Sequence, residues 1–181
     1  LDEDYLSTST GGTSTSAFTS SNPVGTVRAS PYAPLLANHA YEVVASRYCN
    51  SGATTTADET IKNVTLGTIN KTTTDCDTYN DFTAMSTSLS QTLTYSLSLT
   101  IGDCEGSGCY SKSAAAYIDW NQDYDFTDAG ELVWSSGALT SLPCPDMVLA
   151  GNSITVPDDA TVGATRMRVI VVEFATPPPA P

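Results

Sequence analysis

Residues 92–101 alternate apolar and hydroxyl side chains without a break, T-L-T-Y-S-L-S-L-T-I. Leu93, Tyr95, Leu97, Leu99 and Ile101 fall on one side of this alternation, and Thr and Ser fall on the other. Successive side chains of a β-strand point to opposite faces of a sheet. The period of two therefore predicts a strand with one buried face and one solvated face.

Other short segments rich in β-branched and aromatic residues also predict strands, and no long helical pattern separates them. Several short strands bounded by Gly, Pro, Asn and Asp are typical of an antiparallel β-sandwich, so we expect an all-β fold. Residues 31–48 fit either a strand or a short helix. The further predicted strands are residues 61–69, 114–120, 131–134, 153–156 and 167–172.

Three regions differ in composition. Residues 1–47 form a Ser/Thr-rich stretch that is too polar to build a core of its own, and we expect an extended N-terminal arm there. Residues 48–174 carry the strand patterns and are expected to form the sandwich. Residues 175–181, A-T-P-P-P-A-P, cannot continue a sheet and predict a stiff polyproline-type tail.

The charge of the chain restricts its partners. Seven Lys and Arg oppose twenty Asp and Glu, which gives a formal net charge of −13. Such a surface repels phosphate backbones, so nucleic-acid binding is not expected, whereas divalent cations are natural partners. No run of about 18 apolar residues predicts a membrane span.

The segment from Asp119 to Glu131 is the densest group of carboxylates, D-W-N-Q-D-Y-D-F-T-D-A-G-E. Oxygen ligands at alternate positions, followed by a later Glu, suit a loop that wraps around Ca²⁺. The pattern departs from an EF-hand loop in its Gly and Glu positions, so we expect a calcium loop between strands rather than between helices. A solvated acidic turn is the alternative. The expected ligands are Asp119, Asn121, Asp123, Asp125 and Glu131.

The cysteines do not have the spacing of a zinc site, and disulfides formed outside the cytosol explain them better. Cys104 and Cys109 are close enough in sequence for a local bridge, but the connectivity cannot be deduced. Because the disulfides favour a location outside the cytosol, we expect an extracellular or cell-surface protein. The chain starts at L-D-E-D-Y, so its signal peptide is expected to have been removed already. The disulfide candidates are Cys49, Cys76, Cys104, Cys109 and Cys144.

Two sequons, at Asn63 and Asn70, make N-linked glycans an expected covalent modification. Trp120 and Trp134 flank the acidic loop and could stack on a sugar ring, although burial at strand ends is the more common role of such residues. The single histidine, His39, has no nucleophile motif near it, so we do not expect an enzyme.

Several motifs of the chain are informative when they are taken together. They are Y-C at 48–49, I-K-N-V-T-L-G-T-I-N at 61–70, Y-N-D-F-T at 79–83, Y-I-D-W-N-Q-D-Y-D-F-T-D-A-G-E at 117–131 and I-T-V-P-D-D-A-T-V-G-A-T-R-M-R-V at 154–169. With these motifs, residues 48–173 resemble the GEVED domain, a β-sandwich module of secreted and surface-anchored proteins. The resemblance implies an extracellular, non-catalytic module.

The chain departs from the family pattern after R-M-R-V, where V-I-V-V-E-F leads into the proline-rich tail instead of a final strand bearing G-E-V-E-D-Y. A sandwich without that strand would have an open edge. The N-terminal arm could fill it within its own chain, or in the next subunit by donor-strand complementation. Head-to-tail insertion does not close on itself and makes a filament of identical copies.

We therefore expect a structural subunit of an extracellular filament or surface fibre, stabilised by Ca²⁺ and glycosylated. A monomeric cell-surface adhesin or carbohydrate-binding module is the alternative. A filament subunit should be recovered in very large assemblies, whereas a binding module should stay monomeric and bind a glycan saturably.

Overall fold

The computed structural model describes residues 6–7, 42–43, 48–55, 59–104, 110–140 and 146–173. Contacts divide the chain into two units, Leu1–Tyr48 and Cys49–Pro181. In the first unit, the structure describes Tyr48 and two short strands, β1 (Leu6–Ser7) and β2 (Glu42–Val43), which pair antiparallel. The rest of the predicted N-terminal arm and the proline-rich tail lie outside the described residues.

The second unit contains a four-stranded antiparallel sheet in the order β4-β3-β5-β8. The two longest strands of this sheet, β5 and β8, are neighbours. Their pairing runs from Thr94 opposite Thr155 to Gly102 opposite Asp146. Strands β4 and β8 form its two edges. The strand bounds are β3 Thr60–Leu66, β4 Ile69–Thr72, β5 Thr94–Gly102 and β8 Asp146–Thr155.

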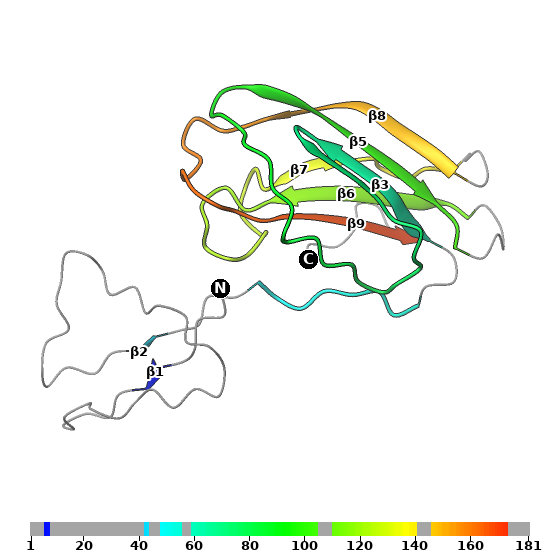
Figure 1. The fold of residues 1–181 in the computed structure, drawn as a ribbon, viewed down its shortest axis with the longest axis horizontal. Coiled ribbons are helices and arrows are strands. Elements are labelled where there is room, and N and C mark those ends of the chain that lie inside the picture. The colour runs from blue at the N-terminus through cyan, green and yellow to red at the C-terminus, as the bar shows by residue number, and fades with distance from the viewer. Residues whose placement is uncertain are drawn as a thin grey trace, which may run out of the picture. The chain divides into compact units, whose positions relative to one another are not determined.

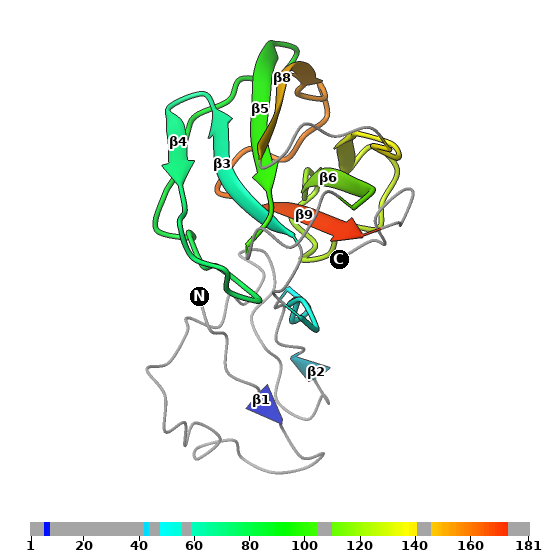
Figure 2. The same cartoon turned by 90° about the vertical axis from the view of Figure 1, so that its right-hand side faces the viewer.

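A three-stranded antiparallel sheet in the order β7-β6-β9 forms the second layer, as Figures 1 and 2 show. Its central strand β6 (Lys112–Ile118) is buried along its whole length. Strands β7 (Leu132–Ser135) and β9 (Met167–Glu173) form the edges of this sheet. The described residues contain no helix, so the predicted all-β fold is confirmed.

The core lies between the two sheets. The alternating residues of β5 supply Leu97, Leu99 and Ile101, each at most 1% exposed. From the other sheet, β6 supplies Ala114, Ala116 and Ile118. Small alanine side chains on β6 let the larger leucine and isoleucine side chains of β5 pack between the layers, which gives the close packing that a sandwich core requires.

Two sequence predictions about strand extent were wrong. Residues 61–69 are not one strand, because Gly67 adopts a φ of 57° and ends β3, after which β4 returns from Ile69. A positive φ is accessible to glycine at little cost, so Gly67 and Thr68 make the turn of a hairpin. Leu93 precedes β5 and is 53% exposed, so the buried face begins further along the chain than the alternation predicts.

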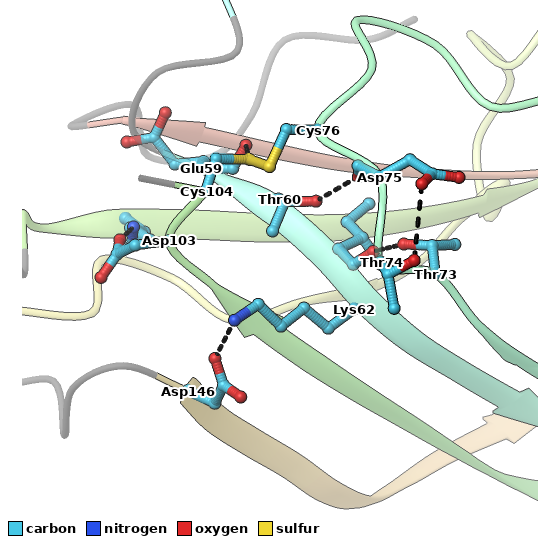
Figure 3. Close-up of a disulfide and its surroundings, with 12 residues drawn as sticks. Glu59, Thr60, Lys62, Thr73, Thr74, Asp75, Cys76, Asp103, Cys104 and Asp146 are labelled. Atoms are coloured by element: carbon cyan, nitrogen blue, oxygen red, sulfur yellow. Dashed lines mark hydrogen bonds and ion pairs between the residues drawn. A yellow bond between two sulfur atoms is a disulfide. The ribbon is translucent and has the colours of Figure 1, made fainter. Parts of the chain in front are cut away.

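One disulfide joins Cys76 to Cys104, across 28 residues. A local bridge between Cys104 and Cys109 is therefore not what forms. Cys76 follows β4, and Cys104 follows β5 (Figure 3). The bond therefore ties the segment after the β3–β4 hairpin to the end of β5. Cys49 is an exposed free thiol, and Cys109 and Cys144 lie outside the described residues.

The disulfide indicates that this protein folds in an oxidising compartment. In the described part of the chain, no helix is long and apolar enough to cross a membrane.

Candidate metal site in the acidic loop

The acidic loop, residues 119–131, connects the end of β6 to the start of β7. Its two ends are held side by side because the Ile118 N–H donates to the carbonyl of Glu131 at 2.9 Å. Asp119 and Glu131 are 0% and 2% exposed, so the loop begins and ends with a buried carboxylate. A buried carboxylate is costly unless hydrogen bonds or a cation compensate its charge.

Asp119 organises the first turn of the loop. Its Oδ1 accepts a hydrogen bond from the Gln122 N–H at 2.6 Å, and its Oδ2 accepts one from the Tyr124 N–H at 3.1 Å. Gln122 and Tyr124 have φ values of 63° and 75°, a left-handed conformation that is uncommon for residues other than glycine. The two bonds hold the backbone in this curved path around the Asp119 carboxylate.

Three Asx turns follow one another along the loop. The backbone N–H of Asp123 donates to Asn121, that of Asp125 donates to Asp123, and that of Thr127 donates to Asp125, at 2.8–3.1 Å. Asn and Asp favour this local i to i+2 bond. The alternation of Asn and Asp in the sequence therefore forms a series of turns. It is also compatible with metal binding, because each Asx turn leaves further oxygen lone pairs available.

Glu131 closes the loop. Its Oε1 accepts a hydrogen bond from the Trp120 N–H at 3.1 Å, and its Oε2 accepts one from the Asp128 N–H at 3.2 Å. Burial raises the pKa of the Glu131 carboxyl above its ordinary value, and the negative charges of Asp119 and Asp123 raise it further, against the two backbone hydrogen bonds. A proton or a cation at this carboxylate would relieve the charge.

The structure brings carboxylates together in two groups that share Asp123. In the first, oxygens of Asp119, Asp123 and Glu131 lie within 4.8 Å of one another. In the second, oxygens of Asp123, Asp125 and Asp128 do so. Two oxygens bound to one Ca²⁺ at about 2.4 Å are at most about 4.8 Å apart, so one ion can span each group.

The predicted ligands do not form a single set. Asp125 belongs to the second group, together with Asp128. The prediction from sequence spacing missed Asp128, because it counted only alternate positions and the final Glu. Asn121 lies between the carboxylates and donates from Nδ2 to Asp123 at 2.9 Å and to Asp128 at 2.6 Å. The Asn121 Oδ1 accepts a hydrogen bond from the Asp123 N–H at 3.1 Å and keeps a second lone pair, which is what a calcium ligand requires.

Aromatic residues attach the loop to the sandwich. Phe126 is 2% exposed and packs edge-on against Tyr117 of β6, with ring centres 6.3 Å apart. The guanidinium of Arg168 on β9 lies 5.0 Å from the centre of the Phe126 ring. Trp120 and Trp134 are half-buried against the core. The loop therefore presents its carboxylates from a backbone anchored on rigid strands.

The fold and the loop define a two-sheet all-β module with an acidic connection between adjacent strands. The family model of the GEVED domain matches residues 113–181, so this part of the chain is similar to that family, in agreement with the resemblance of its motifs. The motifs before residue 113 lie outside this match. No curated protein and no solved structure matches the chain.

Proposed function

We propose that this protein is a non-catalytic structural subunit of an extracellular filament or surface fibre. In this proposal, the N-terminal arm of one subunit adds as a strand to the sandwich of the next, and Ca²⁺ stabilises the sandwich. The partners are then copies of the same chain, joined head to tail.

The observation that carries the proposal is the edge formed by β9. This strand pairs with β6 on one side, and no described strand pairs with its other side. Between Val169 and Val172 the strand has neither a charge nor a proline. Proteins usually protect an exposed edge with such residues, because an unprotected apolar edge is a template for another strand.

The faces of β9 also suit strand addition. Met167, Val169 and Val171 pack against the core, which leaves Ile170 and Val172 on the opposite face of the sheet. An added strand would gain backbone hydrogen bonds along the edge and apolar contacts with side chains on both faces. The arm supplies sparse apolar residues in a polar Ser/Thr sequence, namely Leu6, Phe18, Val24 and Val27.

The acidic loop supports the calcium part of the proposal. Two buried carboxylates are brought together at the ends of one loop, with a third, Asp123, facing both. Their combined negative charge opposes close packing unless a cation lies among them. Since the loop joins β6 to β7 in the sheet that contains β9, a bound cation would fix the sheet that offers the edge.

Glycans fit the outer face of the other sheet. Asn70 on β4 is exposed, whereas Asn63 on β3 is half-buried and its Nδ2 donates to Asn70 and to Thr72, each at 3.0 Å. Asn70 is therefore the more accessible of the two proposed acceptor sites. Both side chains lie on the β3–β4 hairpin of the four-stranded sheet, whereas the proposed assembly edge, β9, belongs to the three-stranded sheet.

Electron microscopy of the native protein in calcium-containing buffer tests the proposal, with regular filaments as the expected result. A chain lacking residues 1–45 and an Ile170→Lys variant should each remain dispersed, because they remove the donor strand and place a charge on its acceptor edge. Val148→Lys is the matched control, since Val148 lies on β8, the exposed edge of the other sheet. Dispersed wild-type particles would refute the filament.

A monomeric carbohydrate-binding module is the second candidate. Tyr124 is 37% exposed on the acidic loop, where an aromatic ring beside a cation could stack on a sugar. Trp120 and Trp134 favour this candidate less, because they pack against the core. Saturable glycan binding that Tyr124→Ala abolishes, by a protein that stays monomeric, would support this function instead of the filament.

A further inference from the structure

Lys112 and Asp103 form an ion pair inside the sandwich. The Lys112 Nζ contacts the Asp103 Oδ1, and both side chains are 3% exposed. Asp103 continues the inward-facing series of Leu97, Leu99 and Ile101 on β5. Lys112 precedes the inward-facing alanines of β6, so the pair bridges the two sheets from their core faces.

Burial makes this pair unlike an ordinary salt bridge. Removing an ammonium and a carboxylate from water is costly for each ion, and their attraction offsets that cost only with excellent geometry and further hydrogen bonds. A second pair in the same region has the same residue types but faces solvent: the side chains of Lys62 and Asp146 are 29% and 42% exposed (Figure 3). The Lys62–Asp146 pair therefore stays in contact with water, unlike the Lys112–Asp103 pair.

We propose that Lys112 and Asp103 condense into an intramolecular isopeptide bond between Nζ and Cγ. The product amide is neutral, so it removes the two buried charges and keeps the hydrogen-bonding capacity of an amide. The fold holds the amine against the carboxyl, which replaces a bimolecular encounter with an intramolecular one and supplies a large part of the required activation. Condensation goes beyond the proposed filament role and does not depend on it.

The reaction balances with water as its only by-product. The Lys112 ammonium gives one proton to the Asp103 carboxylate, which leaves a neutral amine and a carboxylic acid. The Nζ lone pair attacks Cγ, and the bond from Cγ to the hydroxyl oxygen breaks. The hydroxyl takes the surplus proton from nitrogen and departs as water. Glu173 lies opposite Lys112 in the β6–β9 register, so a second carboxyl on the same face can relay that proton.

The bond would close the loop between the end of β5 and the start of β6. Asp103 is next to Cys104, whose disulfide to Cys76 already ties this end of the four-stranded sheet (Figure 3). The isopeptide would add the only covalent tie among described side chains that joins the two sheets. Covalent ties at one end of a sandwich resist the separation of its layers.

Mass spectrometry of the folded protein, produced without glycans and then reduced, tests the bond. The expected intact mass is lower than the sequence mass by one water molecule. Trypsin should fail to cut after Lys112, because its amine is acylated. Fragmentation should yield no backbone ions from cleavage between residues 103 and 112, because the bond closes that segment into a ring. A full sequence mass with normal cleavage after Lys112 would overturn the proposal.

Variants separate the isopeptide from other losses of water. Asp103→Asn should still condense but lose ammonia instead of water, which identifies the leaving group. Lys112→Arg keeps the charge and cannot form the amide, so its mass should be complete. Lys62→Arg, at the solvated pair, should keep the wild-type deficit. A deficit of one water that persists in Lys112→Arg would overturn the assignment to Lys112.

Discussion

The carboxylates of Asp119 and Glu131 lie within 4.8 Å of each other although twelve positions separate them in the chain. The β6–β7 pairing brings them together, because it places the two ends of the acidic loop side by side. Both groups are buried, and each accepts two backbone hydrogen bonds from the loop. The loop is thus folded around its own negative charge, and its stability should depend on what neutralises that charge.

Calcium should raise the melting temperature of the protein, because an ion held by these carboxylates binds the folded state only. At calcium concentrations about 100 times the Kd, the added stability is about 2.7 kcal/mol. Asp123→Asn should abolish most of the shift, since Asp123 belongs to both carboxylate groups. Asp158→Asn removes the same charge from an exposed position outside the loop and should retain the shift. Equal melting temperatures of the wild type in chelator and in excess calcium would contradict the calcium site.

The raised pKa of Glu131 predicts how stability depends on pH in the absence of calcium. Because burial raises this pKa in the folded state, Glu131 stabilises the fold below its ordinary pKa of 4.5, and that contribution is lost as the pH rises through the folded-state pKa. In chelator, the unfolding free energy of wild type minus that of Glu131→Gln should therefore fall as the pH rises above 4.5.

Urea unfolding at a series of pH values measures this difference. The comparison with Glu131→Gln removes the opposite contribution of Asp123, whose pKa is lowered by hydrogen bonds, first from the Asp125 N–H. Saturating calcium should reverse the slope, since the cation binds the ionised carboxylate. A difference that stays flat or increases with pH in chelator would show that Glu131 is not a desolvated acid.

The sequence predicted the fold class because its signals are local. Alternation in β5 identifies a half-buried strand without knowledge of its partners, and Leu97, Leu99 and Ile101 are buried as that alternation requires. The hairpin of β3 and β4 was missed because Gly67 interrupts a run that is rich in β-branched residues on both sides of it, and such residues favour a strand.

Tertiary relationships were beyond sequence reasoning. The pairing of Cys76 with Cys104 depends on which strands are neighbours, and β3 and β5 are adjacent only in the folded sheet. The proximity of Asp128 to Asp123 and Asp125 depends on the path of the acidic loop rather than on spacing. Burial of Lys112 was equally inaccessible, because lysine is among the residues least often found inside a protein.

Loss of the disulfide should destabilise the sandwich substantially. A cross-link that closes a loop of 28 residues contributes roughly 3–4 kcal/mol in the chain-entropy treatment. The double variant Cys76→Ser, Cys104→Ser should therefore unfold at a clearly lower urea concentration than the wild type. Cys49→Ser is the control, because Cys49 is a free, exposed thiol. Equal unfolding midpoints for the double variant and the wild type would mean that this bond does not constrain the chain.

Gly67→Ala should destabilise the β3–β4 hairpin for two separable reasons. The left-handed φ of 57° costs a residue with a Cβ about 1 kcal/mol. In addition, the new Cβ would meet the Thr87 side chain, whose Oγ1 accepts a hydrogen bond from the Thr68 N–H at 3.0 Å. Moving Thr87 aside breaks that bond, which adds about 1 kcal/mol.

Gly137→Ala separates these two costs, because Gly137 has a similar φ of 62° but no atom within 4 Å of the position that an alanine Cβ would take. Urea unfolding should show a loss of about 1 kcal/mol for Gly137→Ala and about twice that for Gly67→Ala. The Thr87→Ala variant lacks the side chain that an alanine at position 67 would meet. In that background, Gly67→Ala should therefore lower the unfolding free energy only by the cost of the left-handed φ. Equal losses for the two single glycine variants would show that Thr87 does not hold the turn.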